Sequence, residues 1–136
     1  DDVICDDFSY IIIKPSENMP TKDAFALFDK SEKKDVKADF IDEILLKKKK
    51  IDIDFVQKYF YNDFEAVMEQ KFDIISQIKN DFYKNDAVFS MMSGSGTTVY
   101  AIYTDDNLRK RAFENLKSKY KNIFLSNTTK QGVEIL

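Results

Sequence analysis

A chain of 136 residues with 43% hydrophobic residues is about the size of one domain and carries enough apolar surface to bury a core. Its formal net charge of −3 argues against a nucleic-acid binder, because such proteins usually present a basic face to phosphates. With no histidine and Cys5 as the single cysteine, the chain has no serine–histidine catalysis, no zinc or haem site and no internal disulfide. No apolar run approaches about 18 residues and no signal-peptide pattern is present, so a cytoplasmic location is expected.

The first predicted strand covers residues 8–14, an aromatic and β-branched run that contains three consecutive isoleucines. Such residues favour strands, and Pro15 ends this one because proline has no amide hydrogen to continue a ladder. The consecutive isoleucines indicate a central strand of a sheet.

A helical insertion is expected after this strand, over about residues 16–61. Thr21 is placed to cap a short helix that ends near Asp29, and apolar spacing predicts a second helix from about Asp35 to the lysine run 47–50. The four lysines are interpreted as a solvated helix end, where cations meet the negative pole of the helix dipole, rather than as a phosphate or membrane patch.

Two interpretations stay open for residues 51–55, in which apolar side chains alternate with aspartates. The alternation fits a strand, while the apolar positions that follow fit a helix capped by Asp52. The next stretch is clearer. Asn62 can cap a helix and Glu65 can reach back toward it, so one long helix is predicted over residues 64–84.

The stretch around Gly94 and Gly96 organises the second half of the chain. The apolar run 87–89 precedes it, and residues Val99 to Tyr103 alternate after it, with the odd-numbered ones on one side, so two strands flank a Ser-Gly-Ser-Gly turn. Two glycines one residue apart indicate backbone conformations, or close approaches, that a β-carbon would forbid. A hairpin is favoured over a phosphate-binding loop, because the lysine and serine or threonine that end a P-loop are missing.

A last helix is predicted after a cap at Asp105 or Thr104, followed by a strand over residues 122–126 and a tail over residues 127–136. With the insertion set aside, the order is strand, helix, strand, strand, helix, strand. This order is typical of the ferredoxin-like split βαβ fold, an α+β arrangement in which a four-stranded antiparallel sheet carries helices on one face. The chain is expected to be one domain with its core at about residues 8–126.

Four segments together resemble one family: Ile12-Ile13-Lys14-Pro15, Pro20 to Phe25, Asn62-Asp63-Phe64-Glu65, and Met92 to Ala101. In this order and spacing they resemble the carboxy-terminal half of the 4-diphosphocytidyl-2-C-methyl-D-erythritol kinases, a family within the GHMP kinase superfamily. The resemblance covers nearly the whole chain. It implies a GHMP kinase C-terminal domain that acts in non-mevalonate isoprenoid biosynthesis.

The resemblance assigns substrate-binding residues within the insertion. Phe25 matches the family position whose aromatic ring stacks on the cytosine base, and Thr21 lies in the loop-to-helix corner beside it. On the residues alone, Phe25 fits a core position of a short amphipathic helix equally well. Asn62 and Asp63 match a recurrent family pair, for which helix capping is favoured over contact with a ligand.

The glycine-rich turn also has a counterpart in the family. Gly94, Ser95, Gly96 and Thr97 resemble the third GHMP motif, a loop of the carboxy-terminal domain that faces the active-site cleft. Thr97 stands where the family commonly has proline or a small residue.

The resemblance further implies that half of an active site lies elsewhere. In this family the ATP phosphate loop, the catalytic aspartate and its lysine partner belong to the amino-terminal domain, so no catalytic residue is expected here. The parent enzyme would use ATP and magnesium to phosphorylate the 2-hydroxyl of its cytidylyl substrate, and the fragment alone would bind no cofactor. Because the chain does not begin with methionine, we expect it to be a fragment. Without the phosphate loop and the catalytic pair, the fragment is expected to be inactive. Its expected partners are the missing N-terminal kinase domain and the small-molecule substrate.

A ferredoxin-like regulatory or ligand-binding module is the alternative from a different class, because a glycine turn and amphipathic helices would serve it equally well. An RNA-recognition domain is disfavoured. It would need a basic surface and paired aromatic residues in an Arg/Lys-Gly-Phe-Gly-Phe-like strand, and the sequence has neither. Neither nucleic acid nor a membrane is therefore an expected partner.

Overall fold

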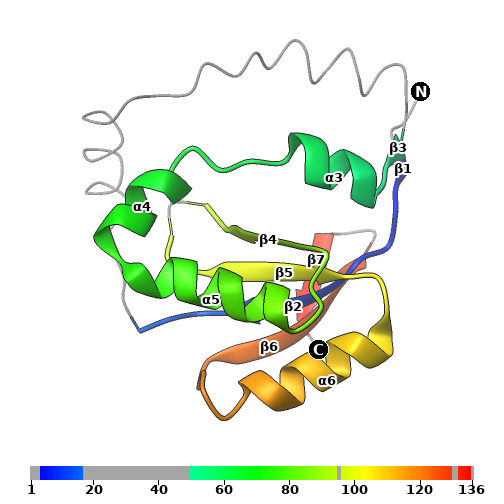
Figure 1. Ribbon diagram of the computed structural model, residues 1–136. Coiled ribbons are helices and arrows are strands. Elements are labelled where there is room, and N and C mark those ends of the chain that lie inside the picture. Colours follow the sequence, from blue (N-terminus) through cyan, green and yellow to red (C-terminus); the bar gives the residue numbers. More distant parts are fainter. Residues whose placement is uncertain (1–3, 17–49, 95, 130–131, 136) are drawn as a thin grey trace.

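The computed structural model describes residues 4–16, 50–94, 96–129 and 132–135. Figure 1 shows the arrangement of the strands and helices in these ranges. They are β1 (Ile4–Cys5), β2 (Ser9–Ile13), β3 (Lys50–Ile51), α3 (Ile53–Tyr59), α4 (Glu65–Lys71), α5 (Asp73–Lys84), β4 (Phe89–Met92), β5 (Val99–Tyr103), α6 (Asp106–Leu116), β6 (Ile123–Thr129) and β7 (Gly132–Ile135). The two helices predicted between Thr21 and the lysine run lie outside the described residues.

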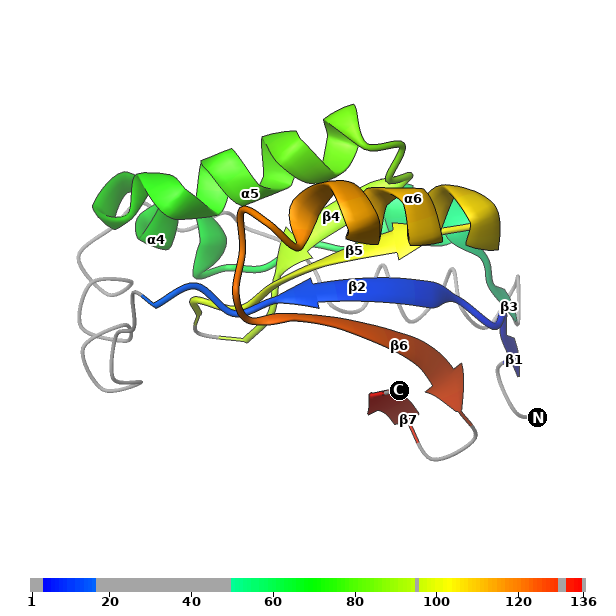
Figure 2. The ribbon, with the colours of Figure 1, turned by 90° about the horizontal axis from the view of Figure 1, so that it is seen from below.

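The central strand of the main sheet is β2, as its isoleucine run predicted. The sheet is antiparallel and has the strand order β4-β5-β2-β6-β7. Ile11 of β2 lies opposite Ala101 of β5 on one side and Leu125 of β6 on the other. The helices α5 and α6 lie together on one face (Figure 2). The predicted split βαβ arrangement of four strands with helices on one face is therefore confirmed.

The predicted tail is wrong, because the chain continues the sheet after residue 126. β6 runs to Thr129, and β7 pairs with it antiparallel, so that a fifth strand joins the sheet. Pairing continues because Phe8, the residue before β2, still offers its backbone amide and carbonyl to the strand beyond residue 126. The Thr128 amide donates to the Phe8 carbonyl at 3.0 Å, and the Phe8 amide donates to the Thr128 hydroxyl at 3.1 Å. Threonine also favours strands, so pairing extends beyond the apolar run.

The main core lies between the sheet and the helices α4, α5 and α6. Odd-numbered residues of β2 and β5 face it, as the period of two predicted, and apolar stripes of the helices cover them. Its fully buried members include Ile11 and Val99 of the sheet and Ile78 and Phe82 of α5. Tyr103 is buried here, and its hydroxyl has no hydrogen-bond partner in the part of the chain that the structure describes. Burial raises the pKa of this phenol because the charged form loses its hydration.

The opposite face of the sheet is partly covered by α3. Phe8, Val56 and Ile102 form a small second core there. The stretch that fitted both a strand and a helix contains both, because β3 pairs in parallel with β1 and α3 begins two residues later. Asp52 caps α3 as predicted, since its carboxylate accepts the Phe55 amide at 2.9 Å.

The long helix predicted over residues 64–84 is wrong, because the structure has two helices there. Phe72 is extended, with φ −130° and ψ 107°, and separates α4 from α5. The break places α4 against the turn between β4 and β5, where Met68 packs beside Gly96, while α5 follows the sheet. Periodicity did not reveal it, because Met68 and Ile75 are seven residues apart and both are fully buried, as in a continuous helix.

α6 is tied to β6 by a buried arginine. Asp105 caps α6 by accepting the Leu108 amide, which confirms one of the two predicted caps. Arg109 is only 5% exposed. Its guanidinium donates to the Ser126 carbonyl at 2.8 Å, to the Asn127 side chain at 3.0 Å and to Asp106 at 2.7 and 3.0 Å. The guanidinium thus exchanges water for fixed partners on two elements.

We expect Arg109→Met to lower the free energy of unfolding by about 2 kcal/mol, measured by urea denaturation. Methionine keeps the apolar packing but leaves the Ser126 carbonyl without its donor, and the half-exposed Asp106 limits the loss because water can replace its partner. Arg111→Met, two residues away and exposed, is the matched control and should change stability by less than about 0.5 kcal/mol. Equal losses for the two variants would contradict a specific role of Arg109.

A second link joins α5 to the chain after α6. The Asp81 carboxylate lies 2.8 Å from the Lys119 ammonium and accepts a hydrogen bond from the Tyr120 hydroxyl. Burial alone would raise the pKa of Asp81, but the hydrogen bonds from Lys119 and Tyr120 outweigh it and hold this pKa below its ordinary value. Burial and the Asp81 carboxylate raise the pKa of Tyr120 to about 12, so the phenol stays a donor at neutral pH.

This link predicts a pH-dependent contribution to stability. Because folding lowers the pKa of Asp81, its carboxylate stabilises the fold above about pH 4, and the contribution is lost as the pH falls through the folded-state value. Asp81→Asn should therefore cost about 1 kcal/mol at pH 7, a value kept small because Lys119 is half exposed, and much less near pH 2.5. Urea denaturation at both pH values measures this, with the exposed Asp7→Asn as control. A loss from Asp81→Asn that is independent of pH would contradict the assignment.

Candidate functional site

The turn between β4 and β5, residues 93–98, is closed by its own backbone. The Ser93 amide donates to the Thr98 carbonyl at 2.8 Å, and the Gly96 amide donates to the Ser93 carbonyl at 3.3 Å. The flanking strands pair from Met92 opposite Val99 onward. The predicted hairpin is therefore confirmed, and two of the amides in the turn are engaged within it.

The two glycines of the turn are required for different reasons. Gly94 has φ +60°, and a Cβ built there would meet nothing within 4 Å. Gly96 has φ +101°, and its Cβ would lie 3.0 Å from Met68 Cε and 3.0 Å from Met92 Sδ. Gly94 therefore presents bare backbone to open space, whereas Gly96 lets the turn pack against the core.

Asn62 holds this turn from outside. Its amide nitrogen donates to the Met92 carbonyl and to the Gly94 carbonyl, each at 2.7 Å. Its side-chain oxygen accepts the Phe64 amide at 2.8 Å, just before α4 begins. The predicted cap is wrong, because Phe64 is the N-cap of α4 and no side chain caps it. Asn62 orders the residues just before the helix instead, and the same side chain fixes both ends of the Met92–Gly94 segment.

Glu65 and Lys79 complete the support. The Glu65 carboxylate accepts the Met92 amide at 2.8 Å instead of reaching back toward Asn62, so the predicted capping box is wrong. Lys79 lies 3.2 Å from Glu65 and 3.1 Å from Glu69. Burial alone would lower the pKa of Lys79, but the two carboxylates outweigh it and raise this pKa, so the side chain stays a cation. The glycine-rich turn is therefore fixed by a charged network.

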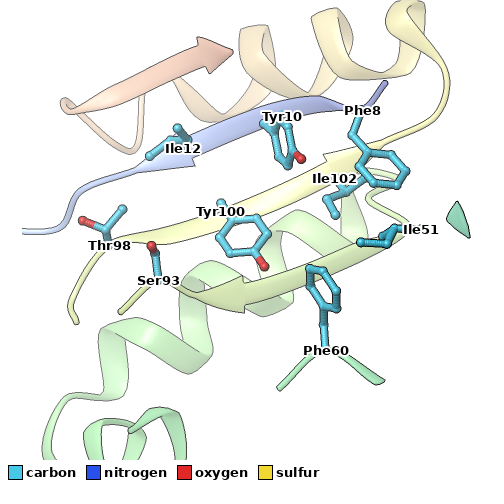
Figure 3. A pocket seen from close by; sticks show the side chains of 9 residues that line it. All are labelled: Phe8, Tyr10, Ile12, Ile51, Phe60, Ser93, Thr98, Tyr100 and Ile102. Carbon is cyan, nitrogen blue, oxygen red and sulfur yellow. The ribbon is translucent and has the colours of Figure 1, made fainter. Parts of the chain in front are cut away.

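A cavity of about 330 Å³ lies on the face of the sheet opposite α5 and α6. Ser93 and Thr98, the two ends of the turn, border it (Figure 3). The described residues that line it are Phe8, Tyr10, Ile12, Ile51, Phe60, Ser93, Thr98, Tyr100 and Ile102. The glycine-rich turn thus borders a cavity and is also held by Asn62 and Glu65.

The structure brings only some of the predicted site residues together. Gly94, Gly96 and the buried Thr97 lie in the turn, whereas Ser95 and the predicted substrate-binding pair, Phe25 and Thr21, lie outside the described residues. Within the described ranges, no group of three or more histidine, cysteine, aspartate or glutamate side chains could hold a metal ion. No helix in those ranges is long and apolar enough to cross a membrane.

Comparison with known proteins identifies the family. Residues 48–122 match the family model described as GHMP kinases C terminal, which is more than half of the chain. The chain belongs to the GHMP kinase C-terminal family. The matched segment of this GHMP kinase C-terminal domain runs from just before β3 to the start of β6, so it contains the glycine-rich turn and the side chains that hold it.

Relatives of this GHMP kinase C-terminal domain carry one name. A 4-diphosphocytidyl-2-C-methyl-D-erythritol kinase from Caldanaerobacter subterraneus subsp. tengcongensis is 32% identical over 126 residues, which is 93% of this chain and 43% of that protein. A kinase of the same name from Clostridium perfringens is 37% identical over 112 residues, which is 82% of this chain and 38% of that protein. The chain therefore spans less than half the length of the curated relatives it matches.

Solved structures agree on the fold. A crystal structure of 4-(cytidine 5'-diphospho)-2C-methyl-D-erythritol kinase superposes with a TM-score of 0.67 at 15% identity, covering 91% of this chain and 44% of that one. Homoserine kinase from Cytophaga hutchinsonii gives a TM-score of 0.63 at 15% identity, covering 99% and 46%. At such identities the likeness shows the GHMP kinase C-terminal fold.

Proposed function

We propose that this chain is the substrate-binding C-terminal half of an ATP-dependent kinase that phosphorylates the 2-hydroxyl of 4-diphosphocytidyl-2-C-methyl-D-erythritol in isoprenoid biosynthesis. The observation that carries the proposal is the glycine-rich turn fixed by Asn62 and Glu65, in a chain 32–37% identical to kinases of that name. A turn held this firmly can present backbone to a ligand without paying ordering entropy on binding.

The described residues bind and orient rather than react. Transfer of a phosphoryl group depends mainly on positioning and on charge stabilisation, which ATP with magnesium and its ligands would supply. From the resemblance to these kinases, we assign the ATP loop and the catalytic aspartate and lysine to an N-terminal half. The role left to this chain is to hold the substrate, with Gly94 as the backbone position open to a ligand.

A chimera tests the proposal directly. The segment of the Caldanaerobacter kinase that aligns with this chain would be replaced by this chain, and phosphorylation of the cytidylyl substrate measured. We expect turnover within about tenfold of a typical enzyme rate near ~10 s⁻¹, and no turnover by the isolated chain. A folded chimera without activity would contradict the proposal. Thermal stabilisation of the isolated chain by amino acids, with no response to cytidine nucleotides, would favour a regulatory module instead.

The substrate side of the proposal rests on Phe25, whose ring we assign to stacking on cytosine, with Thr21 beside it. In the active chimera, Phe25→Ala should lower kcat/KM for the cytidylyl substrate by about 10- to 100-fold and leave the KM for ATP nearly unchanged. Phe25→Tyr keeps an aromatic face and should retain most of the activity. If the alanine variant unfolds, or if the kinetic constants for ATP and for the substrate worsen equally, Phe25 has a structural role.

A further inference from the structure

The cavity behind the turn differs in chemistry from a site for a phosphorylated substrate. Its described lining contains no charged side chain, and most of its wall comes from apolar residues of β2, β5 and the segments that flank α3. At about 330 Å³ it falls within the usual size range of small-molecule sites, about 300–1,000 Å³. Against these described residues an anion would lose its hydration without gaining a cation, so this part of the wall disfavours a diphosphate.

The walls of the cavity are already ordered. The rings of Tyr10 and Tyr100 meet edge to face at 6.1 Å, and those of Phe8 and Tyr10 do so at 6.4 Å. The Thr128 hydroxyl donates to the Tyr10 hydroxyl at 3.1 Å and fixes that ring further. Phe60, which is 40% exposed, also lines the cavity, and its ring meets that of Phe89 edge to face at 6.5 Å.

One end of the cavity is polar. The side-chain hydroxyls of Ser93, Thr98 and Tyr100 make no hydrogen bond with any described residue. Figure 3 shows Ser93 and Thr98 at the end next to the turn, Tyr100 between the two ends with its hydroxyl directed toward Phe60, and Phe8, Ile51 and Ile102 toward the other end. Burial, with smaller effects of neighbouring Tyr10 and Glu65, raises the pKa of Tyr100, so its hydroxyl is a neutral donor at physiological pH.

We propose that this cavity binds an uncharged, largely apolar small molecule that carries a hydroxyl or carbonyl oxygen at one end. The apolar part lies against Phe8, Ile51 and Ile102, and the oxygen end meets the hydroxyls that line the rest of the cavity, those of Ser93, Thr98 and Tyr100. Because Ser93 and Thr98 are the two ends of the glycine-rich turn, an occupant contacts this turn directly. The inference does not depend on the kinase assignment, because it rests on the lining alone.

The test uses the chain as it is and a matched pair of aromatic probes. 2-Naphthol is neutral at pH 7 and has one hydroxyl on an apolar ring system, whereas 2-naphthoate has the same rings and a negative charge. Binding is followed by titration calorimetry and by shifts of backbone amide resonances. We expect 2-naphthol to bind at least about 10-fold more tightly than 2-naphthoate, with the largest shifts at residues of β2, β5 and the turn.

Two nearly isosteric variants locate the polar end. Tyr100→Phe and Thr98→Val each remove a hydroxyl that has no partner among the described residues, so both should keep the melting temperature and weaken the binding of 2-naphthol by about 5-fold. Tyr61→Phe, at an exposed tyrosine outside the described lining of the cavity, should change neither the melting temperature nor the affinity for 2-naphthol. Phe60→Ala should weaken the binding of both probes. Equal affinity for the two probes, unchanged affinity in the Tyr100 and Thr98 variants, or no binding of 2-naphthol would overturn the proposal.

Discussion

Gly96→Val is expected to lower the free energy of unfolding by about 4 kcal/mol, because two separate costs meet at this position. The backbone has φ +101°, which L residues rarely adopt and β-branched residues tolerate least. The new Cβ would also lie 3.0 Å from side-chain atoms of Met68 and Met92, both fully buried. The flexible ends of both methionines would have to give by a few tenths of an ångström within the packed core. Urea denaturation of the isolated chain measures the loss.

Gly94 provides the matched control, since it lies in the same turn with φ +60° and open space around its Cβ position. Gly94→Asn should cost less than about 1 kcal/mol, because asparagine tolerates the left-handed region, and Gly94→Val should cost about 1–3 kcal/mol. Equal losses at Gly94 and Gly96 would contradict the packing argument. Unchanged midpoints for both valine variants would contradict the backbone argument as well.

Asn62→Asp is expected to cost about 3 kcal/mol, at least as much as Asn62→Ala. Aspartate also has a side-chain oxygen at this position, so it keeps the acceptor for the Phe64 amide. It loses both donors, however, and places a carboxylate oxygen 2.7 Å from the Met92 and Gly94 carbonyls. The substitution therefore separates the role in the turn from the role before α4.

Urea denaturation measures the loss, and amide hydrogen exchange at Ser93 and Gly96 shows whether the turn opens. Both amides should exchange faster in Asn62→Asp and stay protected in Asp63→Ala, an exposed neighbour used as control. In the chimeric kinase, Asn62→Asp should reduce kcat/KM even under conditions in which the variant remains fully folded. If Asn62→Asp changes neither the free energy of unfolding nor the exchange of these amides, the Asn62 side chain serves only to accept the Phe64 amide.

Local patterns predicted what depends on neighbours in the sequence. The alternation around β5 placed Val99, Ala101 and Tyr103 toward the core, and two close glycines indicated positive φ, which both have. The supporting side chains escaped prediction because their partners are distant: Asn62 contacts a carbonyl 30 residues away, and Glu65 an amide 27 residues away. No spacing rule links such positions, and capping explained the same residues without them.

Other misses have the same origin. The break at Phe72 leaves the apolar period intact, so nothing in the pattern marks where α4 ends. The pairing of β7 depends on β6 having been extended by contacts with Phe8, which lies 120 residues away in the sequence. Sequence patterns report the burial of a position well, and they report its partners only when these are close.

The side chains around β4 have a further consequence for how this domain behaves in a crowded solution. β4 is the outermost strand on its side of the sheet, and such a strand can recruit a strand from another molecule through its free amides and carbonyls. Here those groups are occupied: Gln57 donates to the Val88 carbonyl, the Tyr83 hydroxyl accepts the Ser90 amide, and Glu65 and Asn62 occupy the Met92 amide and carbonyl. Four side chains thus stand where a neighbouring backbone would pair, and they protect this margin of the sheet against edge-to-edge aggregation.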